Sequence, residues 1–285
     1  NTSVATVNSS GKVTAVGPGT ATITVTTSDG SYKATYKLTV KKKVIIVIGA
    51  SQVTRMKLYK TSYSSSNYNY KNSDGTLVYV EKSGSGIDYQ TGDGWTTAKS
   101  TITSYKNTKS QVEFYIYFPL SGNTIKNFVC GSDTHKNSLG KISTTNSYIT
   151  NYAKNYNTVI SNIKKDGYTV KAYVVSMHPV RVSNSNNDKV VTNQNKNSCA
   201  YDYRSNWKYF QFNKAMKSIV ETNYSTNLKY ESLFIKIMET SDEGKTTSPY
   251  NFDYKIPYTT TDGVHWDSAT TDTYVEMMLD YSGDL

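Results

Sequence analysis

The first 40 residues alternate between apolar and polar positions in short segments. These segments cover residues 3–7, 11–16, 20–25 and 32–40, and Gly, Pro or Asp-Gly turns separate them. A period of two places every second side chain on the same face of a strand. The pattern therefore predicts antiparallel strands of a β-sandwich.

From residue 44 onward, continuous apolar runs replace this alternation. Strands are predicted at residues 44–48, 77–80, 112–118, 168–175 and 233–238, and helices at residues 149–163, 207–220 and 269–279. Apolar strands that alternate with helices are typical of a mostly parallel sheet that is covered on both faces. The second part of the chain is therefore predicted to be an α/β domain.

The clearest helix-to-strand unit lies at residues 149–175. Its first half has apolar side chains at helical spacing, and Lys164 and Lys165 suit a helix C-terminus because cations there complement the helix dipole. Asp166-Gly167 is a stop signal for the helix. A strand is expected to begin directly afterwards, at Tyr168.

The composition is that of a globular chain of 285 residues with 36% hydrophobic residues, enough for one large domain and a small one. Its 26 tyrosines indicate either a surface suited to glycans or a biased genome composition. The net charge of +10 favours anionic partners. However, the one tight run, Lys41-Lys42-Lys43, is interpreted as a solvated connector, and no nucleic-acid recognition motif accompanies it. We therefore expect no nucleic-acid partner.

The sequence has no run that approaches the roughly 18 to 20 apolar residues of a membrane span, so none is predicted. It starts at Asn1 without an initiator Met or a signal-type apolar region, which indicates a trimmed or processed piece. Cys130 and Cys199 form one disulfide or remain two thiols, and they lack metal-type spacing. No metal and no cofactor is predicted.

Polar residues and glycines follow the predicted strands. Ser51 follows the run at residues 44–48, Gly84 and Gly86 follow the second strand, and Asn123 follows the third. In a parallel sheet, ligands bind beyond the carboxyl ends of the strands. These residues are therefore candidates for a single site at one edge of the sheet.

The tetrapeptide Asp262-Gly263-Val264-His265 precedes the last predicted helix and is the strongest chemical signal. Together with Ser51 it supplies an alcohol, an imidazole and a carboxylate, the side chains of a serine triad. His265 is the candidate base that removes the Ser51 proton, and Asp262 would hold one tautomer of its ring. The backbone N–H groups of Ser51 and Gly84 and the side-chain amide of Asn123 are the candidate oxyanion donors. Gly86 is the alternative to Gly84.

Residues 44–285 resemble the SGNH or GDSL hydrolase superfamily. The four blocks correspond to Gly49-Ala50-Ser51-Gln52, Gly84, Asn123 and Asp262-Gly263-Val264-His265. This resemblance implies a three-layer α/β/α, flavodoxin-like fold with a serine triad. The sequence departs from the family at Ala50 and Thr124, where Asp is common, and at Ser121, where Gly is common.

Residues 1–40 resemble the later half of the group 2 bacterial immunoglobulin-like domain. The resemblance rests on a Val-Ala-Thr-Val strand, a Gly-Lys-Val-Thr strand and a Pro-Gly-Thr-Ala-Thr-Ile segment. It implies a small β-domain at residues 1–41 and a secreted or surface-attached bacterial protein, and the hydrolase resemblance implies a catalytic domain at residues 42–285. Half a sandwich leaves open edges, so upstream residues are expected to complete it.

Four further residues are candidates for lining the substrate: Gly86, Tyr89, His178 and Trp266. Tyr89, Trp95 and Trp266 can stack on a sugar ring, although packing in the core is the alternative for the tryptophans. His178 follows a strand and is predicted at the same sheet edge, whereas His135 is interpreted as an exposed loop residue.

The sequence therefore predicts a serine esterase that acts on carboxylic esters through an acyl-Ser51 intermediate. O-acetyl groups on a polysaccharide, in the bacterial cell wall or an extracellular glycan, are the favoured substrate. The alternative is a non-catalytic module that keeps the hydrolase fold and binds a glycan.

Overall fold

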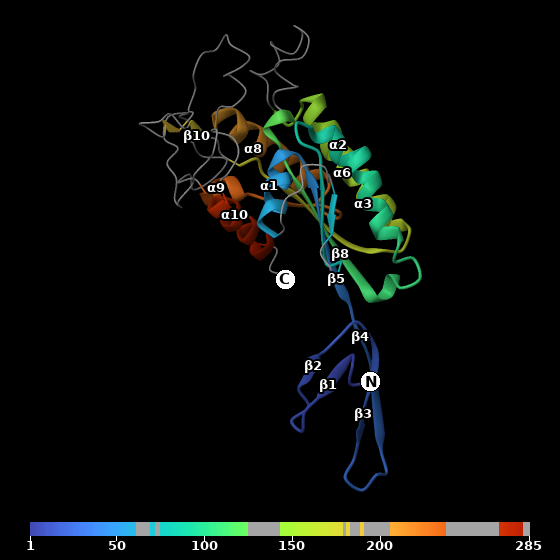
Figure 1. Ribbon diagram of the computed structural model, residues 1–285. Coiled ribbons are helices and arrows are strands. Elements are labelled where there is room, and N and C mark those ends of the chain that lie inside the picture. The colour runs from blue at the N-terminus through green and yellow to red at the C-terminus, as the bar shows by residue number, and fades with distance from the viewer. Residues whose placement is uncertain are drawn as a thin grey trace.

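The computed structural model describes residues 1–60, 69–71, 75–124, 143–178, 181–182, 189–190, 206–237 and 268–281. Its N-terminal strands extend away from a layered α/β body (Figure 1). Strands β1 (Ala5–Val7) and β2 (Val13–Ala15) pair antiparallel, as do β3 (Gly19–Thr26) and β4 (Lys33–Val40). The predicted antiparallel strands of the N-terminal region are thus confirmed, while the domain boundary after residue 41 stays a prediction.

The body is built on a six-stranded sheet in the order β12-β9-β8-β5-β7-β6. Five strands run parallel, and β6 is an antiparallel edge. The strands are β5 (Lys42–Gly49), β6 (Asn69–Lys71), β7 (Leu77–Glu81), β8 (Val112–Pro119), β9 (Thr169–Val175) and β12 (Lys229–Glu231). The chain starts in the middle at β5, adds β7 on one side, and then adds β8, β9 and β12 on the other. This is the flavodoxin-like order, with its switch point between β5 and β8.

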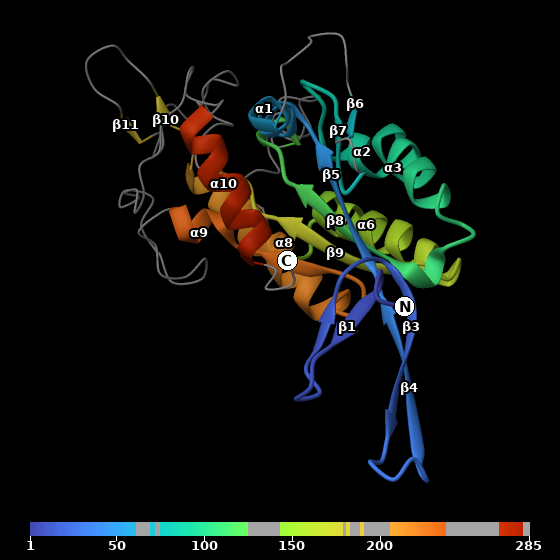
Figure 2. The ribbon, with the colours of Figure 1, turned by 60° about the horizontal axis from the view of Figure 1, so that its bottom comes forward.

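Helices cover both faces of this sheet (Figure 2). One core cluster joins the sheet to α2 (Ile87–Thr91), α3 (Asp93–Thr103), α6 (Ser147–Lys165) and α8 (Asn206–Asn223). A second cluster, on the opposite face, joins it to α1 (Ser51–Lys60) and α10 (Ser268–Tyr281). The smaller elements are η1 (Lys109–Gln111), β10 (Arg181–Val182), β11 (Lys189–Val190) and α9 (Leu233–Ile237). The predicted three-layer α/β/α architecture is confirmed.

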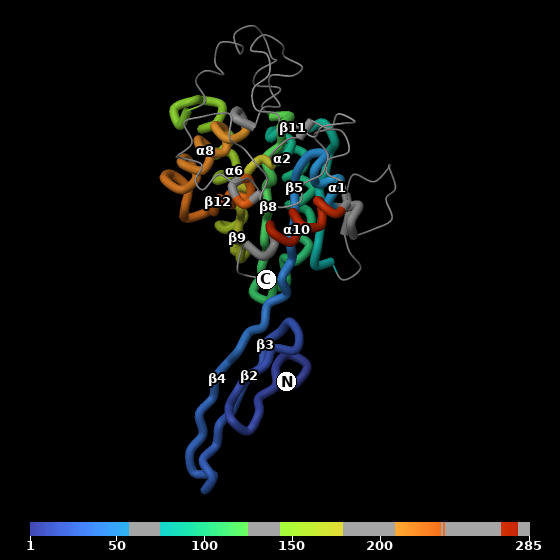
Figure 3. The backbone as a smooth tube through the Cα atoms, turned by 90° about the vertical axis from the view of Figure 1, so that its left-hand side faces the viewer, coloured from blue at the N-terminus to red at the C-terminus, as the bar shows by residue number. Residues whose placement is uncertain are grey.

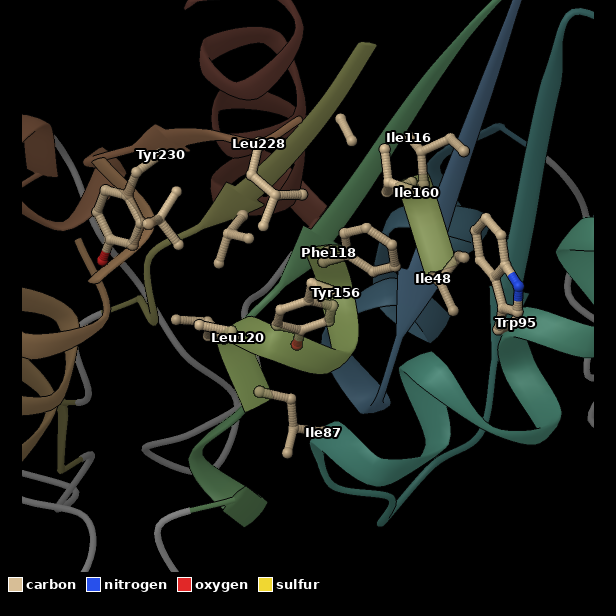
Figure 4. Packing of buried hydrophobic residues seen from close by; sticks show 14 of the residues in the cluster. Ile48, Ile87, Trp95, Ile116, Phe118, Leu120, Tyr156, Ile160, Leu228 and Tyr230 are labelled. Carbon is tan, nitrogen blue, oxygen red and sulfur yellow. The ribbon is translucent and has the colours of Figure 1, made fainter. Parts of the chain in front are cut away.

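Aromatic side chains form the centre of the larger cluster, as Figure 4 shows around Phe118 and Tyr156. The two ring centroids lie 4.5 Å apart, and the Trp95 ring lies 6.4 Å from that of Phe118. Trp95 is only 8% exposed, so it belongs to the core. Of the two alternatives for this tryptophan, packing is therefore the one that the structure supports.

Helix α6 and strand β9 confirm the clearest unit seen in the sequence. The Asn146 side chain accepts a hydrogen bond from the Tyr148 N–H at the start of α6. Asp166 ends the helix, and Gly167 adopts φ of +87°, a conformation that glycine takes without strain.

Two sequence predictions were wrong. Residues 233–238 were expected to form a strand, but Leu233–Ile237 is helix α9, and the edge strand is the preceding β12. A short apolar run has no periodicity that separates a strand from a buried helix turn. The run Lys41-Lys42-Lys43 is not a connector either, because Lys42 and Lys43 pair with Val112 and Glu113 in the sheet. Only Lys41 separates β4 from β5.

Candidate active site

Ser51 lies at the C-terminal end of the central strand, where β5 passes into α1. It is the first residue of the helix and is 8% exposed. The turn is tight, because a Cβ atom on Gly49 would lie 2.6 Å from Cγ2 of Val53. The first N–H groups of a helix have no intrahelical partner, and Ser51 is the first residue of α1.

Gly84 lies in the loop that follows β7, the neighbouring strand. The Lys82 N–H donates to Gly49 O over 3.1 Å, which ties the start of this loop to the end of β5. The Ser85 N–H closes a turn by donating to Lys82 O over 3.1 Å, and Gly84 has φ of +76° within that turn. Gly86 precedes α2 as its N-cap residue.

Asn123 lies beyond β8, on the other side of β5. Its Nδ2 donates to Ser85 O over 3.2 Å, which joins the third candidate block directly to the second. Its backbone N–H donates to Ser121 Oγ over 3.2 Å. The structure therefore brings Asn123 against the loop that carries Gly84, and both follow strands that pair with the one ending at Ser51.

The positions at which the sequence departs from the family are all enclosed. Ala50 is 3% exposed, Ser121 5% and Thr124 2%. Ser121 has a defined structural role, because its hydroxyl accepts the Asn123 N–H. A hydroxyl that caps a turn in this way restrains the following backbone, so Ser121 helps to hold Asn123 in place.

Gln90 fills the gap where β5 and β8 separate at the switch point. Its Nε2 donates to Ile48 O over 2.6 Å and to Pro119 O over 2.9 Å, and its Oε1 accepts the hydroxyl of Tyr156. The side chain is 2% exposed. Buried carbonyl groups need hydrogen-bond partners, so Gln90 supplies those that the sheet ladder no longer provides here. The switch point lies at the carboxyl ends of the strands, at the opposite end of the sheet from the N-terminal strands (Figure 1).

His178 lies at the same edge, beyond β9, and is 2% exposed. Its Nε2 lies 2.9 Å from Nε2 of Gln52, the residue after Ser51. The Gln52 amide and the His178 ring share this hydrogen bond, in which the roles of donor and acceptor depend on the tautomer of the ring. Asn213 fixes the preceding residue, since it accepts the Met177 N–H over 2.8 Å and donates to Met177 O over 3.2 Å. His178 thus contacts the helix that begins at Ser51.

Tyr89 is half-buried on α2. Burial, and after it the negative charges of Glu81 and Asp93, raises the pKa of its hydroxyl to about 12. The hydroxyl is therefore protonated at neutral pH and can donate a hydrogen bond. Tyr89 lines a cavity of about 500 Å³ beside the loop that carries Gly84 and Gly86.

The remaining candidates, Asp262, His265 and Trp266, lie outside the described residues, as do Cys130, Cys199 and His135. The proposed triad therefore stays a prediction. Within the part of the chain that the structure describes, no group of three or more His, Cys, Asp or Glu residues is arranged to hold a metal ion. None of the described helices is both long and apolar enough to cross a membrane.

Sequence reasoning missed several polar residues at this edge of the sheet. Among them, Glu231 has a strongly raised pKa. Glu231 ends β12 and is 1% exposed, and neither carboxyl oxygen has a hydrogen-bond partner among the described residues. Burial raises its pKa to about 8, against the opposing charges of Lys236 and Lys229. Gln52 was adjacent to a named candidate, but no signal in the sequence identified Gln90, Asn213 or Glu231.

Solved structures that are similar to this chain include esterases. A protein from Streptococcus pneumonia described as a candidate platelet activating factor has a TM-score of 0.47 and 18% identity, covering 85% of each chain. The acetyl xylan esterase AlAXEase has a TM-score of 0.42 and 13% sequence identity, and the match covers 85% of this chain and 100% of the esterase. Phospholipase A1 from Streptomyces albidoflavus has a TM-score of 0.42 and 11% sequence identity, and the match covers 84% of this chain and 99% of the phospholipase.

No curated protein matches the sequence. The family model of the bacterial Ig-like domain (group 2) matches residues 1–38, which confirms the N-terminal resemblance. Residues 1–38 are therefore similar in sequence to a bacterial Ig-like domain.

Proposed function

We propose that this chain is a serine esterase of the SGNH type that hydrolyses carboxylic esters through Ser51. The observation that carries the proposal is the arrangement of three candidates around the switch point. Ser51, Gly84 and Asn123 follow the paired strands β5, β7 and β8, and Asn123 hydrogen-bonds the loop of Gly84. The switch point of an open α/β sheet is where ligands bind.

In this proposal, Ser51 Oγ attacks the ester carbonyl carbon while His265 accepts the hydroxyl proton. Asp262 holds the imidazole in the tautomer that can accept it and stabilises the imidazolium. The carbon–oxygen bond to the alcohol then breaks, and His265 protonates the departing oxygen. A water molecule, deprotonated by His265, hydrolyses the acyl-Ser51 ester and releases the acid.

Asn123 is suited to stabilise the tetrahedral intermediate. A side-chain amide carries two N–H groups, and the hydrogen bond to Ser85 O uses one of them and orients the amide. The second N–H, with the backbone N–H groups of Ser51 and Gly84, would bind the negatively charged oxygen. Loss of one such donor typically lowers turnover by about 10² to 10³-fold.

O-acetyl groups on a carbohydrate are the substrate we propose, and secretion or attachment to the bacterial surface is the location. The location is supported by the Ig-like segment at residues 1–38. The carbohydrate is supported by the abundance of tyrosine, 26 residues in the chain, with polar side chains. The partner would thus be an acetylated polysaccharide of the cell wall or of an extracellular glycan.

The decisive experiment is hydrolysis of p-nitrophenyl acetate by wild type and Ser51→Ala. We expect a loss of about 10³-fold or more, and a wild-type rate that rises between pH 5 and 8 as His265 loses its proton. Ser100→Ala is the matched control, because Ser100 is exposed on α3 and its hydroxyl only donates to Thr97 O. It should keep the wild-type rate.

Mass spectrometry after fluorophosphonate treatment checks the nucleophile directly, and the adduct is expected on Ser51. An adduct on another residue would remove the proposed nucleophile. Equal rates for wild type and Ser51→Ala would support the alternative, a non-catalytic glycan-binding module that keeps the fold.

A further inference from the structure

A cavity of about 500 Å³ opens beside the candidate site, between the loop that follows β7 and the starts of α2 and α3. Small-molecule sites typically have about 300 to 1,000 Å³, so this cavity has the size of a ligand site. Gly84 and Ser85 form one wall, and Lys82, Asp88, Tyr89 and Asp93 contribute most of the polar groups.

The cavity shares a wall with the proposed oxyanion site. Ser85 lines the cavity, and its carbonyl oxygen accepts the hydrogen bond from Asn123 Nδ2. Gly84, the proposed backbone donor, lines the cavity as well. A group bound here would therefore lie next to the ester carbonyl, where one half of the substrate has to be.

The lining carries hydrogen-bonding groups of both kinds, donors and acceptors. Asp88 and Asp93 are exposed carboxylates that accept hydrogen bonds, and Lys82 is an exposed ammonium group that donates them. The other described lining residues are glycines, serines and Tyr89, so within the part of the chain that the structure describes no Val, Leu, Ile or Met side chain lines the cavity. This composition suits an alcohol with many hydroxyl groups and disfavours a fatty chain.

Tyr89 is the one aromatic residue among the described residues of this lining, and Gly94 and Lys82 lie beside its ring. A Cβ atom on Gly94 would lie 2.8 Å from Cε1 of the ring, so only glycine fits beneath it. The Lys82 ammonium lies 6.0 Å from the ring centroid. The hydroxyl stays protonated, because burial and nearby charges raise its pKa to about 12. Tyr89 thus offers a fixed ring and a hydrogen-bond donor.

We propose that this cavity, the Tyr89 cavity, binds a sugar ring in the alcohol half of the ester. The ring lies against Tyr89, while Asp88, Asp93 and Lys82 bind its hydroxyl groups. This inference deepens the proposed esterase function, because it places the alcohol half on the side of Gly84 and Asn123. It selects carbohydrate esters over lipid esters as the substrate class.

Binding of unacetylated sugars tests the cavity without any chemistry. The Ser51→Ala protein is titrated with xylotriose, cellotriose and chitotriose while backbone amide NMR shifts are recorded. We expect at least one sugar to shift amides within residues 82–93, and Tyr89→Ala in the same background to weaken binding about tenfold or more. Failure of all three sugars to shift these amides, or unchanged binding in Tyr89→Ala, would overturn the proposal.

Kinetics provide the second test, with an acetylated sugar of the type that binds and with p-nitrophenyl acetate. In Tyr89→Ala and in Asp88→Asn, the ratio of kcat/KM for the sugar ester to that for p-nitrophenyl acetate should fall about tenfold or more. Asp88 is exposed, so Asp88→Asn preserves folding. Tyr32→Ala, at a tyrosine that is 75% exposed in the N-terminal region, is the matched control.

The two proposals fail in distinguishable ways. Unchanged kcat/KM ratios in a protein that still needs Ser51 for hydrolysis would contradict the sugar site but not the esterase activity. Sugar binding at residues 82–93 without Ser51-dependent hydrolysis would contradict the esterase activity but not the sugar site.

Discussion

The N-terminal strands and the α/β body use the same kinds of apolar side chain but bury them very differently. Among the described residues, six of the seven large hydrophobic side chains that are exposed lie within the first 36 residues. Val25 and Tyr36 are each 66% exposed there, whereas Phe118 and Tyr156 in the body are 0% exposed. The body has helices on both faces of its sheet. The N-terminal strands have only the small cluster around Val4, Ala5 and Ala21.

This difference in burial indicates that the α/β body, and not the N-terminal strands, determines both stability and the geometry of the candidate site. The buried clusters fix the strand ends that carry Ser51 and Asn123, because the sheet residues of those clusters lie on the same strands. The N-terminal strands present most of their large hydrophobic side chains to solvent. Changes in the body should therefore affect both stability and activity, while matched changes in the N-terminal strands should affect neither strongly.

The largest effect is expected from cutting a buried ring. Phe118→Ala removes the contacts with Trp95 and Tyr156 and should lower the free energy of unfolding by about 3 to 5 kcal/mol. Val25→Ala changes a side chain that is 66% exposed and should stay within about 0.5 kcal/mol. Urea unfolding followed by far-UV circular dichroism measures both. Equal costs would mean that the two regions do not differ as their burial indicates.

An intermediate effect is expected from two carboxyl groups with opposite pKa changes. Hydrogen bonds, that from Thr27 foremost, lower the pKa of the exposed Asp29 in the N-terminal region, whereas burial raises the pKa of Glu231 from 4.5 to about 8. A raised pKa in the folded state means that stability is complete below about pH 4.5 and is lost as pH rises toward 8. At pH 7 this loss is about 3 kcal/mol.

Glu231→Gln should remove this loss, because an amide does not ionise. Unfolding free energies of wild type and Glu231→Gln, measured from pH 5 to 8, should diverge as pH rises, with wild type falling more steeply. Asp29→Asn, the matched change in the N-terminal strands, should leave the wild-type slope over this range intact, since its lowered pKa acts only at acidic pH. Parallel slopes for wild type and Glu231→Gln would show that Glu231 is ionised in the folded protein.

The smallest effect on stability comes from two glycines with nearly equal backbone angles. Gly84 has φ of +76° and Gly11 has φ of +79°, and a Cβ atom on either would meet no atom within 4 Å. Gly84→Ala and Gly11→Ala should each cost about 1 kcal/mol. Only Gly84→Ala should also lower hydrolysis of p-nitrophenyl acetate, because its turn holds the proposed oxyanion donor. An equal loss of activity in both variants would argue against a role for this loop.

Much of the architecture was predictable because it depends on local patterns. Five of the residues expected at the sheet edge, Ser51, Gly84, Gly86, Asn123 and His178, follow strands, and the ends of parallel strands meet at one edge whatever the details of packing. The helix at residues 233–237 was missed because four apolar residues around one lysine do not reveal a period.

The hydrogen-bond partners could not be predicted, since they join residues far apart in the chain. Gln52 and His178 are separated by 126 positions, and Gln90 and Tyr156 by 66. Nothing in the residues next to Gln90 or Glu231 indicates that these polar side chains are buried. Their roles depend on the order of the strands in the sheet. The sequence pattern predicts that the strands are parallel but does not predict their order.

The single residue between β4 and β5 has a mechanical consequence. Lys41 alone separates the N-terminal hairpin from the central strand, and Figure 3 shows the chain passing directly from one to the other. Tension applied to the hairpin would therefore pull on β5, the strand that ends at Ser51. Because β5 is hydrogen-bonded to β7 and β8 on its two sides, that tension would act in shear across both ladders, the loading direction in which paired strands resist separation best.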